Sequence, residues 1–120
     1  MNISESHENT LAAYENIIKN IELLPAKSDR QFKIKVTFID NTSLRVSETF
    51  SESKLIRYSY YYLDIKNELI IGWDSAPHHK HLKNFPYHKH VGEYRKIESS
   101  TKMNLEKVLH YMKNEIEKNG

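Results

Sequence analysis

The apolar residues near the start of the chain recur every three or four positions. This spacing runs from Glu8 to Leu24, where leucine, tyrosine and isoleucine fall on one side of a helical wheel. Pro25 follows directly, and proline ends a helix because it lacks an N–H and clashes with the preceding turn. The pattern therefore predicts one amphipathic helix over residues 8–24, with Ser4 or Ser6 as its N-terminal cap.

After this segment the apolar residues alternate with polar ones, which is the period of a strand with one buried face. The turn-forming pairs Asp40-Asn41 and Lys66-Asn67 divide this part of the chain into separate runs. The runs predict strands over residues 31–38, 44–50, 54–63 and 68–73, with a fifth, edge strand within His88–Ile97. Strands that follow one another through short turns form an antiparallel meander.

The last part of the chain returns to helical spacing. Its apolar stripe, preceded by Thr101 or Asn104 as a cap, consists of Leu105, Val108, Leu109, Met112 and Ile116. The order of elements predicts a single domain over residues 1–120 of the α+β class. We expect two layers, an antiparallel meander of four to five strands with an N-terminal and a C-terminal helix packed against it.

The composition is typical of a soluble globular protein, with 38% hydrophobic and 28% charged residues. No apolar run approaches the roughly 18 residues that a membrane span needs, and the N-terminus lacks the features of a signal peptide. The chain has no cysteine, which excludes a disulfide framework and a thiolate metal site. We therefore expect a cytoplasmic protein without a membrane partner.

Five of the seven histidines lie between Pro77 and His90, interleaved with lysines and aromatic residues. The ordinary pKa of histidine lies close to neutrality, so such a group can exchange protons, bind a metal or meet phosphate. Residues 76–97 carry five lysines and arginines against one glutamate, a net charge of +4 in a chain whose total is +2. This local excess favours an anionic partner, and its mixture with aromatic rings is typical of RNA binding.

Three motifs around and within this histidine window carry a family resemblance. They read Arg57-Tyr-Ser-Tyr-Tyr-Tyr62, Gly72-Trp-Asp-Ser-Ala-Pro-His-His79 and Phe85-Pro-Tyr-His-Lys-His90. They resemble the TumE toxin family of small prokaryotic proteins, whose members read approximately Tyr-Ser-Tyr-His-Tyr, Asp-Asn-Ala-Pro-His-His and Phe-Pro-His-His-Lys-His. The similarity covers about residues 54–116, whereas the first helix and hairpin match only in layout.

Two positions depart from the family pattern. Tyr61 stands where many members have histidine, and Tyr87 stands where a further histidine is usual. The resemblance implies the toxin of a type II toxin–antitoxin module, whose partner is a helix-turn-helix antitoxin that represses the shared promoter. By analogy with other small basic α+β toxins, we expect it to cleave or block RNA. The target stays open among messenger RNA, transfer RNA, the ribosome and a nucleotide.

Metal-independent RNA cleavage is the leading candidate chemistry for the histidine window. It needs a base for the 2′-hydroxyl proton, an acid for the leaving oxygen, and positive charge beside the phosphate. The candidate catalytic residues are His81 and His88 as first choices, then His90, His79 and Lys89. The candidate substrate-binding residues are Arg57 and Lys80 for phosphate, and Tyr58, Tyr60, Trp73 and Tyr87 for stacking on bases. Asp74 is close enough in sequence to orient an imidazole, and no cofactor is expected.

Other interpretations stay open. Two histidines two residues apart share a face of a strand and can help to hold zinc, but nearby lysines repel a cation and only Asp74 and Glu93 flank the window as carboxylates. A non-enzymatic binding module, whose histidine loop holds a partner protein or a metal ion, is the alternative function. The alternating tyrosines, Tyr58, Tyr60 and Tyr62, also suit a packed core. His7 and His110 lie outside the window and are expected on the surface.

Overall fold

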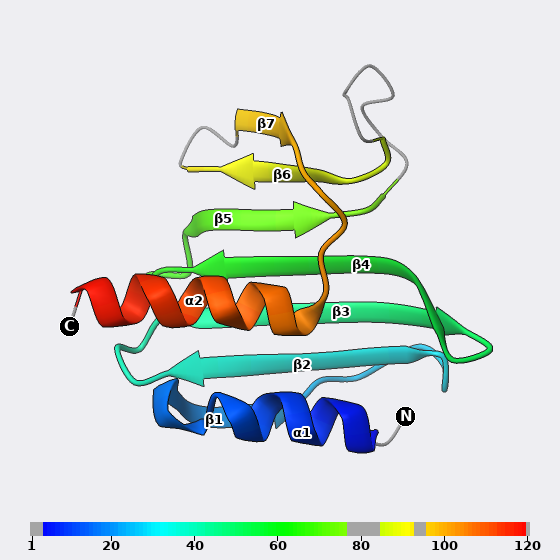
Figure 1. Cartoon of the computed structure of the whole chain (residues 1–120), viewed down its shortest axis with the longest axis horizontal. Helices are drawn as coiled ribbons and strands as arrows, with labels where there is room; N and C mark the ends of the chain where they lie inside the picture. The colour runs from blue at the N-terminus through cyan, green and yellow to red at the C-terminus, as the bar shows by residue number, and fades with distance from the viewer. Residues whose placement is uncertain (1–3, 77–84, 93–95, 120) are drawn as a thin grey trace.

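Seven antiparallel strands form one sheet in which the spatial order follows the order of the chain (Figure 1). The computed structural model describes residues 4–76, 85–92 and 96–119. Within these ranges the strands are β1 Ile18–Leu23, β2 Gln31–Phe38, β3 Ser43–Ser51, β4 Lys54–Leu63, β5 Leu69–Asp74, β6 His88–Val91 and β7 Lys96–Ser99. The helices are α1 Glu5–Ala13 and α2 Leu105–Asn119, and a 3-10 turn, Glu15–Ile17, joins α1 to β1.

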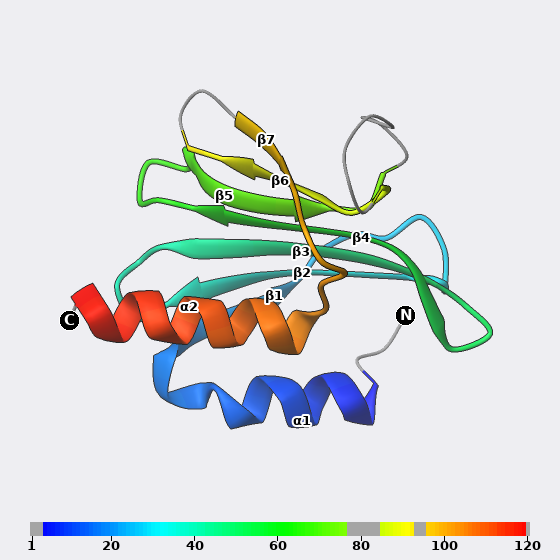
Figure 2. The ribbon, with the colours of Figure 1, turned by 45° about the horizontal axis from the view of Figure 1, so that its top comes forward.

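Both helices lie against the same side of the sheet, as the two views show (Figures 1 and 2). The core lies between the two layers, because alternate residues of each strand point toward the helices. No helix within the described ranges is long and apolar enough to cross a membrane. The opposite side of the sheet is covered by neither α1 nor α2, and we call it the open face (Figure 2).

The strands and α2 together supply the core. Its fully buried members include Phe32, Ile34, Leu44, Val108 and Met112. Trp73 of β5 packs edge-on against Tyr111 of α2, with ring centroids 5.1 Å apart. Each fully buried leucine, isoleucine or phenylalanine contributes about 1.5–3 kcal/mol through the area it removes from water. The tight contact between the two layers fixes which face of the sheet is left open.

The predicted class, a two-layer α+β domain with a helix at each end, is confirmed, but the sheet has seven strands rather than four to five. One extra strand comes from the predicted helix over residues 8–24, which was wrong in its second half. β1 pairs there with β2, from Ile18 opposite Phe38 to Leu23 opposite Ile34. Isoleucine is compatible with the spacing of both a helix and a strand. The free edge of β2 offers backbone hydrogen bonds to this segment, and these favour the strand.

The second extra strand comes from His88–Ile97, which the alternation predicted as one edge strand. The chain instead forms the hairpin of β6 and β7, with Val91 opposite Lys96. Gly92 directly follows β6 and has a φ of +75°, a left-handed conformation that glycine adopts without steric cost. The chain therefore leaves the extended conformation at Gly92 and returns to the sheet edge as β7.

Among the predicted helix caps, the structure uses Ser4 and Asn104. The Ser4 hydroxyl accepts a hydrogen bond from the backbone N–H of His7 at 3.1 Å. The Asn104 side chain accepts one from the backbone N–H of Lys107 at 2.8 Å. Each satisfies a donor that has no partner within its helix.

The buried tyrosines of β4 predict unfolding in alkali. Burial raises the pKa of Tyr58, Tyr60 and Tyr62 above the ordinary value of 10.0, and for Tyr60 the neighbouring Glu48 carboxylate raises it further. Above about pH 10 the unfolded chain ionises these groups while the folded chain keeps them neutral, so stability falls as the pH rises. We expect near-ultraviolet tyrosinate absorbance and loss of circular dichroism to change together for these residues.

Absorbance and circular dichroism are recorded on the same samples, because only a coincident change links the ionisation of the buried tyrosines to unfolding. A single tyrosinate transition near pH 10 that accounts for all eight tyrosines, with circular dichroism unchanged, would contradict the prediction.

Candidate functional site

Polar side chains line up across the open face because the strands are in register. One row crosses from β3 to β6 and consists of Ser47, Ser59, Asp74 and His88, each opposite the next. The neighbouring row consists of Arg45, Tyr61, Gly72 and His90. Residues opposite one another in antiparallel strands share a face, so these two rows form one continuous polar surface.

Asp74, His88 and His90 form a cluster where the rows cross from β5 to β6. Each of the three residues offers one possible ligand atom, a carboxylate oxygen or a ring nitrogen. These three atoms all lie within 4.8 Å of one another. The two imidazole rings meet edge-on with their centroids 5.1 Å apart. His88 is only 2% exposed, whereas Asp74 and His90 are half-buried. We call these three residues the Asp–His–His cluster.

Hydrogen bonds hold two members of this cluster in place. The Nδ1 atom of His88 lies 2.9 Å from the Pro86 carbonyl oxygen, so Nδ1 carries a proton and donates a hydrogen bond to this oxygen. Asp74 accepts two bonds, from the Ala76 N–H to Oδ1 at 2.6 Å and from the Tyr61 hydroxyl to Oδ2 at 2.7 Å. Such outer contacts fix the orientation of side chains that meet a ligand.

Gly72 makes room for the Tyr61 ring. A Cβ atom at this position would lie 2.2 Å from Cδ1 of Tyr61, which is far inside van der Waals contact. The ring leans over the glycine, with its centroid 6.3 Å from that of His90 and its hydroxyl on Asp74. The absence of a side chain at Gly72 therefore lets Tyr61 reach the cluster from the neighbouring strand.

Positive charge lies beside the cluster on the same face. Arg57 is exposed and lines a hollow of about 270 Å³ together with Asp74, Ser59 and Thr49. The row positions on β2 and β3 add Lys33, Lys35 and Arg45. This set of basic side chains extends from the hollow across the sheet toward β2.

Several predicted site residues lie on the other, helix-covered face. Lys89 is opposite Trp73 in the register, and its ammonium group lies 3.8 Å from a Glu98 carboxylate oxygen. The alternation of a strand turns Lys89 away from its neighbours His88 and His90. The prediction that Lys89 acts beside them therefore does not agree with the fold.

The predicted stacking residues are core residues or neighbours of the core. Tyr60 and Trp73 are 0% and 4% exposed, and Tyr58 is also buried. Tyr87 lies against Tyr58, with parallel rings and centroids 6.3 Å apart. Rings that the fold covers are not available to a base, so their interpretation as core residues agrees with the structure better.

Arg57, His88 and His90 are the predicted site residues that the open face brings together. His79, Lys80 and His81 lie outside the described residues, and their predicted roles stay predictions. Asp74 lies opposite His88 in the register, and its role in orienting an imidazole stays a prediction.

Gly72 and the basic residues of β2 and β3 were not predicted as site residues from the sequence, and Tyr61 was noted only as a departure from the family pattern. The alternation along β4 could have identified Tyr61, because it lies two residues from Ser59 and four from Arg57 and so shares their face of the strand. The predicted stacking residues of β4 were placed on the face of Tyr58 instead, because that face is richer in aromatic residues.

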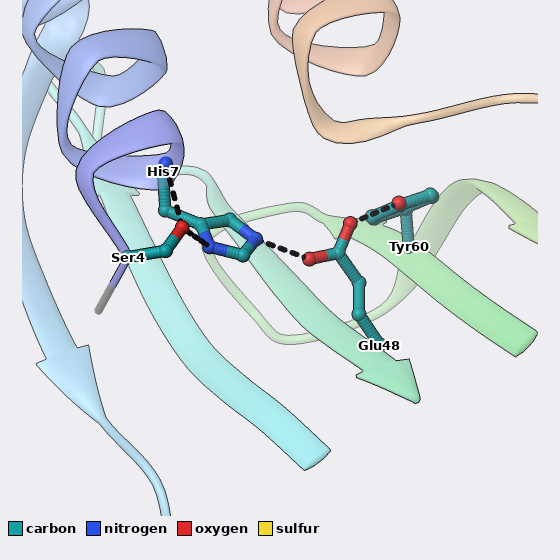
Figure 3. A network of polar contacts seen from close by, with 4 residues as sticks. All are labelled: Ser4, His7, Glu48 and Tyr60. Atoms are coloured by element: carbon teal, nitrogen blue, oxygen red, sulfur yellow. Dashed lines mark hydrogen bonds and ion pairs between the residues drawn. The ribbon is translucent and has the colours of Figure 1, made fainter. Parts of the chain in front are cut away.

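A second polar network lies on the helix-covered side, at the N-terminal end of α1 (Figure 3). The Nε2 atom of His7 lies 2.8 Å from Oε1 of Glu48, and the Tyr60 hydroxyl donates to Oε2 at 2.5 Å. On its other side, Nδ1 of His7 lies 2.6 Å from the Ser4 hydroxyl. The prediction that His7 is a plain surface residue was wrong, whereas His110 is exposed as predicted.

This network fastens α1 to the sheet. The His7 ring stacks on Phe32 at 4.0 Å and meets Phe50 edge-on at 5.8 Å, so its contacts are apolar as well as polar. A cavity of about 580 Å³ adjoins His7 and Glu48. The Ser4 hydroxyl already accepts the backbone N–H of His7 as a helix cap, so the network serves to position the helix.

Comparison with known families bears directly on this fold and site. The family model described as Toxin TumE matches residues 8–119, a range that includes most of α1, the whole sheet and α2. Comparisons with curated proteins and with solved structures gave no match. Because the family model covers nearly the whole length, including the N-terminal part where the motifs matched only in layout, the chain belongs to the TumE toxin family.

Proposed function

We propose that this toxin acts on RNA through the open face and cleaves it at the Asp–His–His cluster. The observation that carries the proposal is the convergence of Asp74, His88 and His90 beside the exposed Arg57. Cleavage of a phosphodiester requires activation of an attacking oxygen and positive charge on the phosphate as it gains charge in the transition state. The cluster and the arginine supply groups suited to these two tasks.

Arg57 would hold the phosphate at the scissile bond. Its guanidinium is planar, always charged, and able to donate two parallel hydrogen bonds to phosphate oxygens. It lines the same hollow as Asp74, so a phosphate bound there would lie next to the cluster. The position of Arg57 therefore supports contact with phosphate, as the sequence predicted.

The remaining length of RNA would follow the basic residues across the sheet. Lys33, Lys35 and Arg45 lie on the open face at successive register positions, in the direction away from β6. The rings of Tyr58, Tyr60 and Trp73 are buried, so contacts to phosphates would dominate the binding. Phosphate contacts position an RNA without reading its bases, and we therefore expect low sequence preference from this surface.

The toxin family implies an antitoxin partner. We propose that this partner is of the helix-turn-helix type and that the pair acts in the cytoplasm. Antitoxin bound over the open face would cover the basic residues and the cluster together, which would block RNA directly.

The test compares growth and RNA integrity after induced expression of the wild type and of Arg57→Ala. We expect the wild type to arrest growth with cut RNA, and the variant to cleave purified RNA about 100-fold more slowly, because one charged contact to the transition state is lost. Arg30→Ala is the matched control, since Arg30 is also exposed but lines the cavity at α1. It should retain full activity at an equal level of folded protein.

Binding to a single-stranded RNA under non-cleaving conditions gives a second readout. Each phosphate contact contributes about −0.7 to the slope of log affinity against log salt, so four basic residues predict a slope near −3. Lys35→Ala/Arg45→Ala should reduce it by about 1.4. Growth arrest by Arg57→Ala equal to that of the wild type, with intact RNA and no salt dependence, would contradict the proposal and favour the non-enzymatic binding module.

A further inference from the structure

The Asp–His–His cluster has the donor set of a transition-metal site. Two imidazole nitrogens and one carboxylate are the ligands that catalytic zinc sites use when they keep a further position for water or substrate. The three ligand-type atoms already lie within 4.8 Å of one another. We propose that Asp74, His88 and His90 bind one divalent transition-metal ion of the zinc type.

The hydrogen bonds around the cluster agree with this assignment. A metal ligand histidine usually donates its second ring N–H to a carbonyl or carboxylate, and His88 has Nδ1 at 2.9 Å from the Pro86 carbonyl oxygen. The Nε2 atom of this ring would then be the ligand atom. The Tyr61 hydroxyl and the Ala76 N–H hold the Asp74 carboxylate in the same manner.

Binding requires only a small contraction of the cluster. Bonds of about 2.1 Å to a tetrahedral zinc ion place its ligand atoms about 3.4 Å apart. The present separations of up to 4.8 Å can close by rotation of the His90 side chain, which is half-buried rather than locked in the core. The buried His88 ring would stay in place as the fixed ligand.

Within the part of the chain that the structure describes, the fold weakens both objections that the sequence raised against a metal. Asp74, one of the two carboxylates that flank the histidine window in the sequence, lies directly opposite His88 in the register. Lys89, the lysine between the two histidines, faces the other side of the sheet and lies near Glu98. Arg57 is on the same face, but it is exposed, so solvent and salt screen its repulsion.

The position of the cluster gives the ion an open side. Asp74 belongs both to the cluster and to the lining of the hollow that Arg57 shares. An ion there would polarise an oxygen bound in the hollow and take up charge from a phosphate. This role rests on the proposed RNA cleavage, whereas the binding of the ion does not.

Direct metal titration of the untagged full chain, after treatment with a chelator, tests the site. We expect one equivalent of Zn²⁺ by calorimetry, and Co²⁺ to give visible absorption bands of a low-symmetry nitrogen and oxygen site. Asp74→Asn and His90→Ala should each weaken Zn²⁺ binding by more than about 100-fold. Tyr61→Phe, which removes only an outer hydrogen bond, should weaken it about 10-fold.

Two controls separate this site from other histidines. His110→Ala removes an exposed histidine of α2 and should leave the affinity unchanged. His78→Ala/His79→Ala/His81→Ala removes the other histidines of the window and should also retain the one equivalent. Circular dichroism of Asp74→Asn and His90→Ala at equal concentration establishes that they are folded, and Zn²⁺ should raise the unfolding temperature of the wild type but not theirs.

Absence of binding at micromolar Zn²⁺ would overturn the proposal, as would an affinity that depends on His78, His79 and His81 but not on Asp74 and His90. The proposed function fails in a different way. Metal binding by the cluster without RNA cleavage would leave the site established and remove the ribonuclease. RNA cleavage by a chain that binds no metal would support the ribonuclease and overturn the metal site.

Discussion

Replacing Glu48 by alanine is expected to lower the free energy of unfolding by about 3 kcal/mol, enough to unfold a marginally stable domain at raised temperature. Glu48 is 3% exposed, and its carboxylate is the common partner of the Tyr60 hydroxyl and the His7 ring. Its removal leaves a buried hydroxyl without its acceptor, costing about 1–3 kcal/mol, and creates a cavity beneath α1. Urea unfolding followed by circular dichroism measures the loss.

A matched control and a double variant separate the network from charge alone. Glu22→Ala removes an exposed glutamate of β1 and should change stability by less than about 0.5 kcal/mol. Glu48→Leu/Tyr60→Phe replaces two hydrogen-bonded partners by apolar groups of similar shape and should be less destabilised than the two single changes added together. Equal stabilities of Glu48→Ala and Glu22→Ala would show that the network does not hold the fold.

Replacing Gly72 by alanine is expected to cost about 2 kcal/mol and to damage the candidate site at the same time. The new Cβ would lie 2.2 Å from Cδ1 and 2.6 Å from Cε1 of Tyr61, so the ring must move. Overpacking of this kind typically costs about 1–3 kcal/mol. Displacement of the ring also takes its hydroxyl away from Asp74, so the proposed Zn²⁺ affinity should fall at least as far as in Tyr61→Phe.

The double variant Gly72→Ala/Tyr61→Ala distinguishes a clash with Tyr61 from a backbone effect. Without the ring, the alanine Cβ has space, so the added cost of Gly72→Ala should largely disappear when measured by urea unfolding. Gly92→Ala is a useful comparison, because its Cβ would meet no atom within 4 Å and its cost would come from the positive φ alone. An unchanged cost in the Tyr61→Ala background would assign the effect to the β5 backbone.

The candidate site was only partly predictable from the chain. The histidine window identified His88 and His90, and the polar run of β4 identified Arg57. Lys89 was grouped with the histidines because they are neighbours in sequence, yet alternation along β6 places it on the opposite face. Strict alternation along this segment separates Tyr87 and Lys89 from His88 and His90 on the sequence alone.

The buried network at α1 left a weaker trace in the sequence. Glu48 occupies the phase of β3 that also carries Leu44 and Val46, so a charged residue at a core position was visible. A buried carboxylate needs partners, but nothing local indicates that they come from α1 and β4. His7 and Glu48 are 41 positions apart in the sequence and meet through tertiary contact alone.

By itself, the sequence determined the properties that depend on neighbours along the chain. These are the periods of two and 3.6, the turns, the helix caps and the family motifs, because local geometry links each residue to those two to four positions away. Only the tertiary structure decided that residues 18–23 extend the sheet, that Asp74 lies opposite His88, and that the helices leave the basic face open. Those outcomes depend on strand register and layer packing between distant segments, which compete through burial and hydrogen bonding rather than local preference.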